Sequence, residues 1–201
     1  MILRSAQASP FARKVRIAAT LLSLDRRITI EAADTTNPAD TVRQQNPLGK
    51  IPALVLDDGS ALFDSRVIID YLDHLADGGG RIVPVEPHAR FAALRLQALA
   101  DGIMDASILR IYENRWRDPA KHEPKWVEHQ VGKVARGLAA LEAEPQARDT
   151  TPTIGQIALA CVLGYLDFRF QGTWRKDHPR LVKYLDEFAA AVPAFNATAP
   201  A

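Results

Sequence analysis

The residues whose types and spacing could do chemistry lie mainly in one stretch, residues 46–65, which joins a proline loop to the start of a helix. Ile51-Pro52 is an X–Pro step, the one kind of peptide bond in which the cis form is cheap. Asp64 and Ser65 precede apolar residues at helical spacing, and either can cap a helix whose free backbone N–H groups suit a carboxylate. The sequence therefore predicts an anion pocket beside a proline loop.

A β-hairpin is predicted between the proline loop and the capped helix. Residues 53–56 form a short apolar run that suits a strand, and residues 61–63 provide a return strand. The dipeptide Asp58-Gly59 between them is typical of a type I′ turn. The stretch is therefore predicted to be loop, strand, turn, strand and helix start, in that order.

A further hydroxyl, that of Ser9, stands at another predicted helix start. Serine is a preferred capping residue, and Pro10 suits the first helical position. Apolar residues then follow at helical spacing to about Leu24 and form one face. The basic residues of the segment fall largely on other faces: Arg13, Lys14 and Arg16.

Strands and helices alternate through the first 77 residues. Residues 2–3 open a brief strand, residues 28–32 alternate between apolar and polar side chains as a strand does, and residues 39–45 form a weak helical turn. With the hairpin and the helix after Asp64, the order is strand, helix, strand, helix, strand, strand, helix. This order predicts an α/β layer with packing on both of its faces.

A composition change divides the chain into two predicted domains. Three consecutive glycines, followed by prolines at positions 84 and 87, mark residues 78–86 as a linker. The first domain is then residues 1–77 and the second residues 87–201. Helical spacing dominates the second domain, with helices predicted at about 88–116, 126–144, 153–166 and 179–191.

Two features of the predicted helical domain stand out. The helix from Thr153 begins with a capping box completed by Gln156, and it is apolar almost all round, which predicts a buried centre. The tail after Pro193 is weakly patterned and is expected to fray.

Composition excludes several classes of protein. The chain has 201 residues, 47% of them apolar, and a net charge of +1 with basic and acidic residues interspersed, so no nucleic-acid partner is expected. No stretch approaches the roughly 18 apolar residues of a membrane span, and the N-terminal segment is too mixed for a secretory signal. The lone cysteine, Cys161, fits a reducing compartment and a small buried side chain. We expect a cytoplasmic protein with no membrane partner.

Two aspartates interrupt an apolar stripe on the long helix after the linker. Asp101 and Asp105 could form a carboxylate pair for a metal, but no histidine or further acid completes a ligand set at suitable spacing. We therefore expect no metal. The favoured interpretation is a polar wall that faces the anion pocket across the domains or across a dimer.

Four motifs occur in a fixed order along nearly the whole chain: Ser-Pro-Phe-Ala-Arg-Lys-Val-Arg at 9–16, Asn-Pro-Leu-Gly-Lys-Ile-Pro at 46–52, Phe-Asp-Ser at 63–65, and the Thr153 capping box. Together they resemble the glutathione transferase superfamily. The chain is most similar to bacterial serine-type members, since Ser-Pro-Phe stands where related members carry Cys-Pro-Phe. The resemblance implies an N-terminal thioredoxin-like domain followed by an all-helical C-terminal domain.

The resemblance also implies a ligand for the proline loop. In this family Pro52 would be a cis-proline that lets the backbone of Ile51 pair with the cysteinyl part of glutathione. Asp64 and Ser65 would hold the γ-glutamyl end, and Lys50 would reach the glycyl carboxylate.

Ser9 takes the position of the catalytic hydroxyl in this resemblance. A hydroxyl that donates to the glutathione sulfur, aided by a helix N-terminus, favours the thiolate. Phe11 and Asp101 are further candidate contacts of glutathione. Arg110, Arg115, Trp116 and Arg117 would lie toward the acceptor substrate, or else form an ordinary solvated face.

Each of these residues also has a purely structural interpretation. Ser9 and Asp64 are preferred helix caps, Pro52 suits a turn before a strand, and a loop lysine such as Lys50 is ordinarily solvated. The ligand interpretation rests on their occurrence together in one loop-hairpin-helix unit, with Ser9 ahead of it.

The function that the resemblance implies is glutathione transfer: the thiolate attacks a hydrophobic electrophilic or peroxide small molecule on the helical side, in a homodimer. Two alternatives remain open. One is a transferase-like binding or interaction protein with little turnover. The other is a glutathione-dependent thiol reductase, against which Ser9 argues because a hydroxyl cannot form a mixed disulfide.

Overall fold

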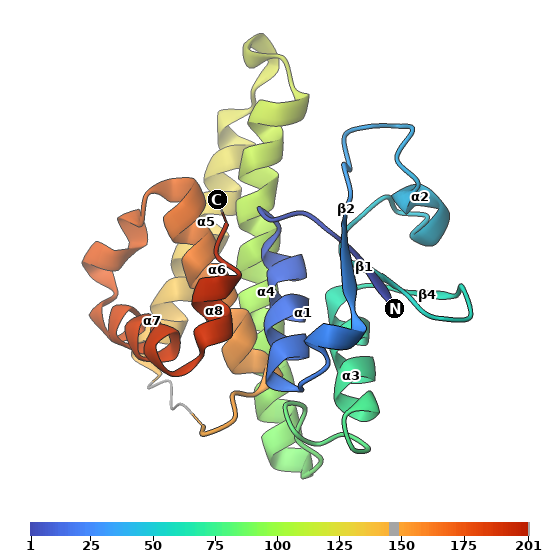
Figure 1. The fold of residues 1–201 in the computed structure, drawn as a ribbon. Helices are drawn as coiled ribbons and strands as arrows, with labels where there is room; N and C mark the ends of the chain where they lie inside the picture. The colour runs from blue at the N-terminus through green and yellow to red at the C-terminus, as the bar shows by residue number, and fades with distance from the viewer. Residues whose placement is uncertain (145–148, 201) are drawn as a thin grey trace.

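A four-stranded mixed sheet forms the N-terminal part of the structure, a computed structural model that describes residues 1–144 and 149–200. The strands are β1 (Ile2–Ser5), β2 (Thr29–Ala32), β3 (Ala53–Val55) and β4 (Ala61–Leu62), in the spatial order β2-β1-β3-β4 (Figure 1). β1 pairs parallel with β2 and antiparallel with β3, and β3 pairs antiparallel with β4. A parallel crossover followed by a hairpin confirms the predicted order of elements.

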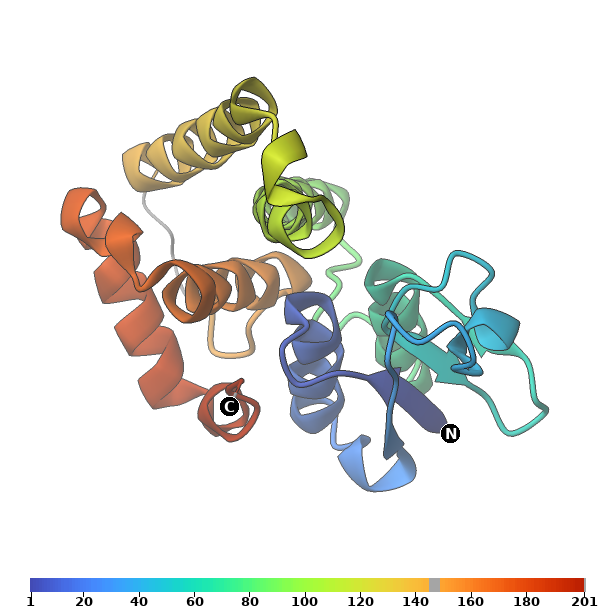
Figure 2. The same cartoon turned by 90° about the horizontal axis from the view of Figure 1, so that it is seen from above.

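Three α-helices and one short turn complete this part: α1 (Pro10–Leu21), η1 (Asp25–Arg27), α2 (Val42–Gln45) and α3 (Ser65–Leu75). α1 packs against α3 and lies between the sheet and the helical part of the molecule, whereas α2 lies on the far side of the sheet from α1 (Figures 1 and 2). The edge strand β2 is exposed along its whole length, with Ile30 58% accessible.

The turn between β3 and β4 differs from the predicted type I′ turn. A type I′ turn needs positive φ at both central residues. Within residues 56–60, all of which the structure describes, only Gly59 has a positive φ, +86°. The Gly59 N–H donates to the Leu56 carbonyl, and the Leu56 N–H donates to the Ser60 carbonyl. The connection is therefore a three-residue loop that ends on a left-handed glycine, the next commonest hairpin geometry.

The C-terminal part is all helical, which confirms the predicted fold class. Its helices are α4 (Pro87–Trp116), α5 (Pro124–Ala143), α6 (Ile154–Phe170), α7 (Pro179–Ala191) and α8 (Pro193–Ala197), with short turns η2 (Pro119–Lys121) and η3 (Thr173–Asp177). α4 and α5 run side by side and project past the sheet at the top of Figure 1. No helix within the described residues is long and apolar enough to cross a membrane.

α6 is the buried centre of the helical part, as predicted. Its residues from Ile154 to Leu163 are buried without interruption, and it packs against α4, α1 and α7. The capping box is confirmed, because the Gln156 N–H donates to the Thr153 hydroxyl at 3.4 Å and the Thr153 N–H donates to Gln156 Oε1 at 2.8 Å. Gly155 permits the close crossing with α4, since a Cβ there would lie 2.4 Å from the Ala93 carbonyl oxygen.

The C-terminal tail is docked, so the prediction that it frays was wrong for the described residues up to 200. α8 follows Pro193, and Phe195 is only 7% exposed and packs edge-on against Phe188 at 5.6 Å. Arg13 of α1 donates to the Phe195 carbonyl oxygen at 2.7 Å. A single aromatic residue and one buried guanidinium therefore hold a segment whose local pattern is weak.

The predicted linker, residues 78–86, lies between α3 and α4 where the structure describes neither helix nor strand. Asp73, 2% exposed, accepts hydrogen bonds from the backbone N–H groups of four consecutive residues, 80–83, at 2.7 to 3.3 Å. The Ile82 carbonyl in turn accepts from Ile154 at the start of α6. The connection is thus tied to both parts of the chain.

Candidate functional site

Three loops meet at one end of the sheet because of its strand register. Arg4 at the end of β1 lies opposite Ala53, the first residue of β3, and Leu54 lies opposite Leu62, the last residue of β4. The loop that leaves β1 toward Ser9, the loop that enters β3 through Pro52, and the chain that leaves β4 at Asp64 therefore emerge side by side. The structure brings the three predicted groups of site residues to one edge.

Ser9 caps the first helix. Its Oγ accepts a hydrogen bond from the Ala12 N–H at 3.2 Å, and Pro10 occupies the first helical position. The contact with Ala12 uses a lone pair of the oxygen and leaves the hydroxyl proton free to donate. No acidic residue lies in the first turn, so the positive end of the helix dipole next to Ser9 is not offset there. Phe11, the next residue but one, is half-buried, with the Lys14 ammonium 5.3 Å from its ring centroid.

The side chain of Asn46 fixes the backbone of the proline loop through two hydrogen bonds. The Ile51–Pro52 peptide bond is cis, and Pro52 is buried, Ile51 half-buried and Lys50 exposed. Asn46, 2% exposed, donates from its amide to the Lys50 carbonyl at 2.8 Å and accepts from the Leu48 N–H at 3.0 Å. The backbone of the loop is therefore fixed, while the Lys50 side chain is exposed to solvent.

Asp64 is the cap of α3. Its Oδ1 accepts from the Arg66 N–H at 2.9 Å and its side chain is exposed, while Ser65 is buried at the first position of the helix. The Phe63–Asp64 peptide bond is also cis. A carboxylate and a helix N-terminus thus stand together, which suits the amino and carboxylate groups of an amino-acid ligand.

A buried ion-pair network lies beneath these loops. Lys14 of α1 and Asp101 of α4 are both 0% exposed, and the Lys14 ammonium lies 2.5 Å from Asp101 Oδ1. Arg66 of α3 donates to Asp101 Oδ2 at 2.8 Å. Asp101 is therefore enclosed by two cations and joins the two parts of the molecule, and it does not form the surface wall predicted for it.

The burial of basic residues on α1 differs from the predicted amphipathic pattern. Arg13 and Lys14 are 4% and 0% exposed because the helical part covers the side of α1 that faces away from the sheet. Arg13 stacks on the Phe195 ring at 3.9 Å, and desolvation lowers its pKa. Both residues are charged, so their burial could not be anticipated from hydrophobic spacing.

Asp105 lies one turn beyond Asp101 on α4 and has an exposed side chain. Desolvation raises the pKa of the Asp105 carboxyl, and the negative charge of Asp101 adds to the shift. The positive charge of Lys50 opposes this pKa shift. Within residues 1–144 and 149–200, no group of three potential metal-binding side chains forms.

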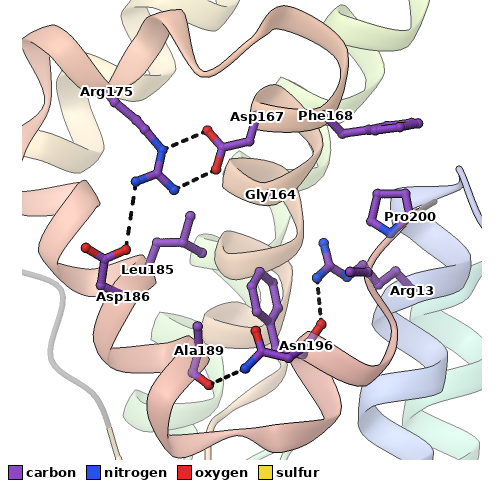
Figure 3. Close-up of a pocket in the computed structure, with 12 residues that line it drawn as sticks. Arg13, Gly164, Asp167, Phe168, Arg175, Leu185, Asp186, Ala189, Asn196 and Pro200 are labelled. Atoms are coloured by element: carbon purple, nitrogen blue, oxygen red, sulfur yellow. Dashed lines mark hydrogen bonds and ion pairs between the residues drawn. The ribbon is translucent and has the colours of Figure 1, made fainter.

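Two cavities elsewhere in the described part of the chain are not lined by Ser9, Pro52 or Asp64. One, of about 450 Å³, lies among α6, α7 and α8 and is bordered by Arg13 and by the Asp167–Arg175 ion pair (Figure 3). The other, of about 250 Å³, lies between α3 and α4. Neither cavity is the predicted anion pocket.

The sequence analysis did not assign structural roles at the site to three residues. Lys14 and Arg66 pair with the buried Asp101, and Asn46 holds the backbone of the proline loop. Asn46 is the first residue of the stretch 46–65, and its Asn-Pro-x-Gly sequence is a turn signal from which its role in holding the loop could have been predicted. Lys14 and Arg66 carry no such local signal, because their partner Asp101 is distant in sequence.

The fold and the site geometry define a two-domain class of protein. Residues 8–75 match the family model for the N-terminal domain of glutathione S-transferase, and residues 124–187 match the model for its C-terminal domain. The chain belongs to the glutathione S-transferase family.

Particular relatives are similar over nearly the whole length. The uncharacterised GST-like protein YibF of Escherichia coli K12 is 35% identical over 192 residues, which is 92% of each chain. A glutathione S-transferase structure from Methylobacillus flagellatus with glutathione bound is 35% identical, with a TM-score of 0.91 over 100% of this chain and 99% of that one. A family member from Pseudomonas fluorescens Pf-5 with bound glutathione is 42% identical, with a TM-score of 0.89 over 100% and 98%. A structure of a family member from Pseudomonas fluorescens Pf-5 with bound S-(propanoic acid)-glutathione is 42% identical, with a TM-score of 0.86 over 100% of both chains.

Proposed function

We propose that this protein binds glutathione along the proline loop and α3, activates its thiol at Ser9, and transfers it to an electrophilic or peroxide small molecule. The observation that supports the proposal best is the convergence of Ser9, Pro52 and Asp64 at one edge of the sheet. Relatives of similar length that carry bound glutathione support the ligand.

Each part of glutathione has a proposed partner. The backbone of Ile51, ahead of cis Pro52, pairs with the cysteinyl unit. The exposed carboxylate of Asp64 meets the amino group, the N-terminus of α3 at Ser65 meets the γ-glutamyl carboxylate, and Lys50 meets the glycyl carboxylate. Phe11 borders the sulfur. Asp101 is fully buried, so its proposed role is indirect: it fixes Arg66 beside the site and does not contact glutathione itself.

The chemical step needs a thiolate. A free thiol titrates near pH 8.5, so only roughly 3% is ionised at pH 7, and each unit by which the pKa falls supplies about 1.4 kcal/mol. The Ser9 hydroxyl proton is free to donate to the sulfur, and the N-terminus of α1 adds a positive partial charge. Both favour the thiolate, which then attacks the acceptor while Ser9 itself forms no covalent bond.

A thiol reductase is the weaker candidate. Cys161 is the single cysteine of the sequence; it is fully buried, and desolvation raises its pKa to about 11. It therefore cannot replace the missing cysteine at position 9.

The test measures glutathione binding by calorimetry and conjugation rate in Ser9→Ala. We expect binding in both proteins and a rate about 10²-fold lower in the variant, as for loss of one well-placed donor. Loss of the cap alone destabilises by about 1 kcal/mol, so Thr153→Ala, which removes the cap of α6 and leaves the site intact, is the control and should keep its rate. Glutathione binding without any conversion across a panel of electrophiles would favour the non-catalytic alternative.

Assembly and location complete the proposal. We propose a cytoplasmic homodimer in which the N-terminal domain, residues 1–77, of one subunit faces the helical domain, residues 87–201, of the other. Light scattering of the purified protein tests the oligomeric state, and a monomer at micromolar concentration would contradict it.

A further inference from the structure

A cluster of aromatic and basic side chains lies near the end of α6 and on α4, outside the groups assigned to glutathione. We call it the arginine–tyrosine cluster; it consists of Tyr112, Arg115, Tyr165, Phe168 and Arg169. The Arg115 guanidinium lies 5.5 Å from the ring centroid of Tyr112, and the Arg169 guanidinium lies 4.4 Å from Phe168 and 6.0 Å from Tyr165. Tyr165 also interacts electrostatically with both arginines and with Tyr112, so the members share one neighbourhood.

Helix register places the α6 members of this cluster level with Ser9. α1 and α6 run in opposite directions (Figure 1), and Arg13 of α1 lies against Gly164, where a Cβ would be 2.7 Å from the Arg13 Nη1. Ser9 is four residues before Arg13, about 6 Å along the axis. Four residues after Gly164 on α6 is Phe168, so Phe168 and Arg169 are level with Ser9. In Figure 3, Phe168 points from α6 to the side on which Arg13 lies.

The α4 members extend the cluster beyond Ser9. Lys14 of α1 pairs with Asp101 of α4, and these helices also run in opposite directions (Figure 1). The level of Ser9 is therefore near residue 106 of α4, so Tyr112 lies six residues, about 9 Å, and Arg115 nine residues, about 13 Å, further along the helix axis. The cluster thus borders the space above the N-terminus of α1, into which a sulfur held by Ser9 would point.

Two arginines of the cluster lack carboxylate partners. Arg117 pairs with Glu113 at 3.3 Å, and Arg110 covers the Phe170 ring at 4.0 Å. Arg115 and Arg169, in contrast, have no carboxylate within ion-pair distance among residues 1–144 and 149–200. The Nε of Arg169 is buried and donates no hydrogen bond within the same residues. A buried guanidinium N–H without an acceptor is costly and is normally matched by a ligand or water.

Tyr165 supplies a neutral donor. Its side chain is 5% exposed, and desolvation raises the pKa of its hydroxyl above the ordinary value near 10. It therefore stays protonated at physiological pH. The Tyr165 oxygen is hydrogen-bonded to Arg169, and its proton remains to donate to an incoming oxygen anion. The residues Tyr112 and Phe168 are 40% and 36% exposed and offer apolar ring faces.

We propose that the arginine–tyrosine cluster binds a carboxylate on the acceptor substrate, so that this enzyme prefers anionic electrophiles with a short apolar body. The inference rests on the proposed function, because it places the acceptor next to a thiolate at Ser9. Guanidinium groups match carboxylates in geometry and charge. The expected acceptor is thereby changed from a purely hydrophobic molecule to one with a charged end.

The experiment compares two glutathione thioethers that differ only at one group, S-carboxymethylglutathione and S-carbamoylmethylglutathione, by calorimetry on the full chain. We expect the carboxylate to bind at least about tenfold more tightly, which is about 1.4 kcal/mol. Arg115→Gln and Arg169→Gln should each remove most of that preference without changing the affinity for glutathione itself. The preference should also weaken as salt is raised.

Arg117→Gln is the matched control, because it removes the same charge two residues from Arg115 but from a guanidinium that is already paired with Glu113. It should keep the preference. Arg115 is exposed, so its variant tests the inference even if Arg169→Gln fails to fold. Equal affinity for the two thioethers in a protein that binds glutathione would overturn the inference, as would a loss of preference in Arg117→Gln as large as in Arg115→Gln. Failure to bind glutathione would instead refute the proposed function.

Discussion

The substitution Asp101→Asn gives the sharpest test of how this structure is held together. The change is isosteric, yet it removes the negative charge from a site where Asp101 and Lys14 are both 0% exposed. The Lys14 ammonium would keep its burial and lose its carboxylate, while Arg66, whose side chain is 50% exposed, can turn to water. Breaking one partner of a buried pair costs about 3–5 kcal/mol.

The expected loss of unfolding free energy in Asp101→Asn is therefore about 4 kcal/mol. For a chain of this length, that corresponds to a fall in Tm of about 8–16 °C. Urea unfolding, followed by tryptophan fluorescence and far-UV circular dichroism, measures the change. Asp105→Asn is the matched control, because the same substitution one turn away removes an exposed carboxylate that Asp101 repels; it should be neutral or slightly stabilising.

A double-mutant cycle separates the ion pair from general damage. Lys14→Met removes the buried cation and leaves Asp101 with Arg66, so the double variant Lys14→Met, Asp101→Asn should lose at least about 2 kcal/mol less than the sum of the single losses. The reasoning is refuted if Asp101→Asn costs less than about 1 kcal/mol, or if the two single effects simply add.

Three further predictions follow from buried groups. Burial raises the pKa of Cys161 to about 11 in the folded protein, against roughly 8.5 in the unfolded chain. The buried thiol should therefore contribute stability below about pH 8.5 that is lost as the pH rises through 11. In Cys161→Ala the urea midpoint should fall less between pH 8.5 and 11 than in the unmodified protein, and an unchanged fall would contradict this. Asp73→Ala removes the acceptor of four backbone N–H groups and should cost about 3 kcal/mol with faster amide exchange at residues 80–83, whereas Asp70→Ala, exposed on the same helix, should change little. Phe195→Ala should cost about 3 kcal/mol and open the C-terminal segment to proteolysis; equal protease resistance in the variant would show that the aromatic contact does not hold the tail.

The local elements and the loop chemistry could be predicted from the sequence because they follow from short-range rules. The Thr153 capping box and the bounds of α7 agree with the prediction, since caps and proline positions act within a few residues. The cap at Asp64 agrees for the same reason. The order of strands and helices was also predictable, whereas the convergence of the candidate site residues at one edge of the sheet follows from the strand pairing that the structure shows.

Only the tertiary structure decided which charged side chains are buried and which segments with a weak local pattern, such as the C-terminal one, are packed against the rest of the protein. Lys14 and Arg13 lie on faces of α1 that hydrophobic spacing leaves open, and they are buried because Asp101 and the Phe195 carbonyl, 87 and 182 residues away, come to meet them. α8 is held in place because Phe195 packs against Phe188 and its carbonyl accepts from Arg13, contacts that its local sequence pattern does not announce. Whether a polar group is satisfied depends on partners distant in the chain, so the ion-pair network and the arginine–tyrosine cluster become visible only when the helices are assembled.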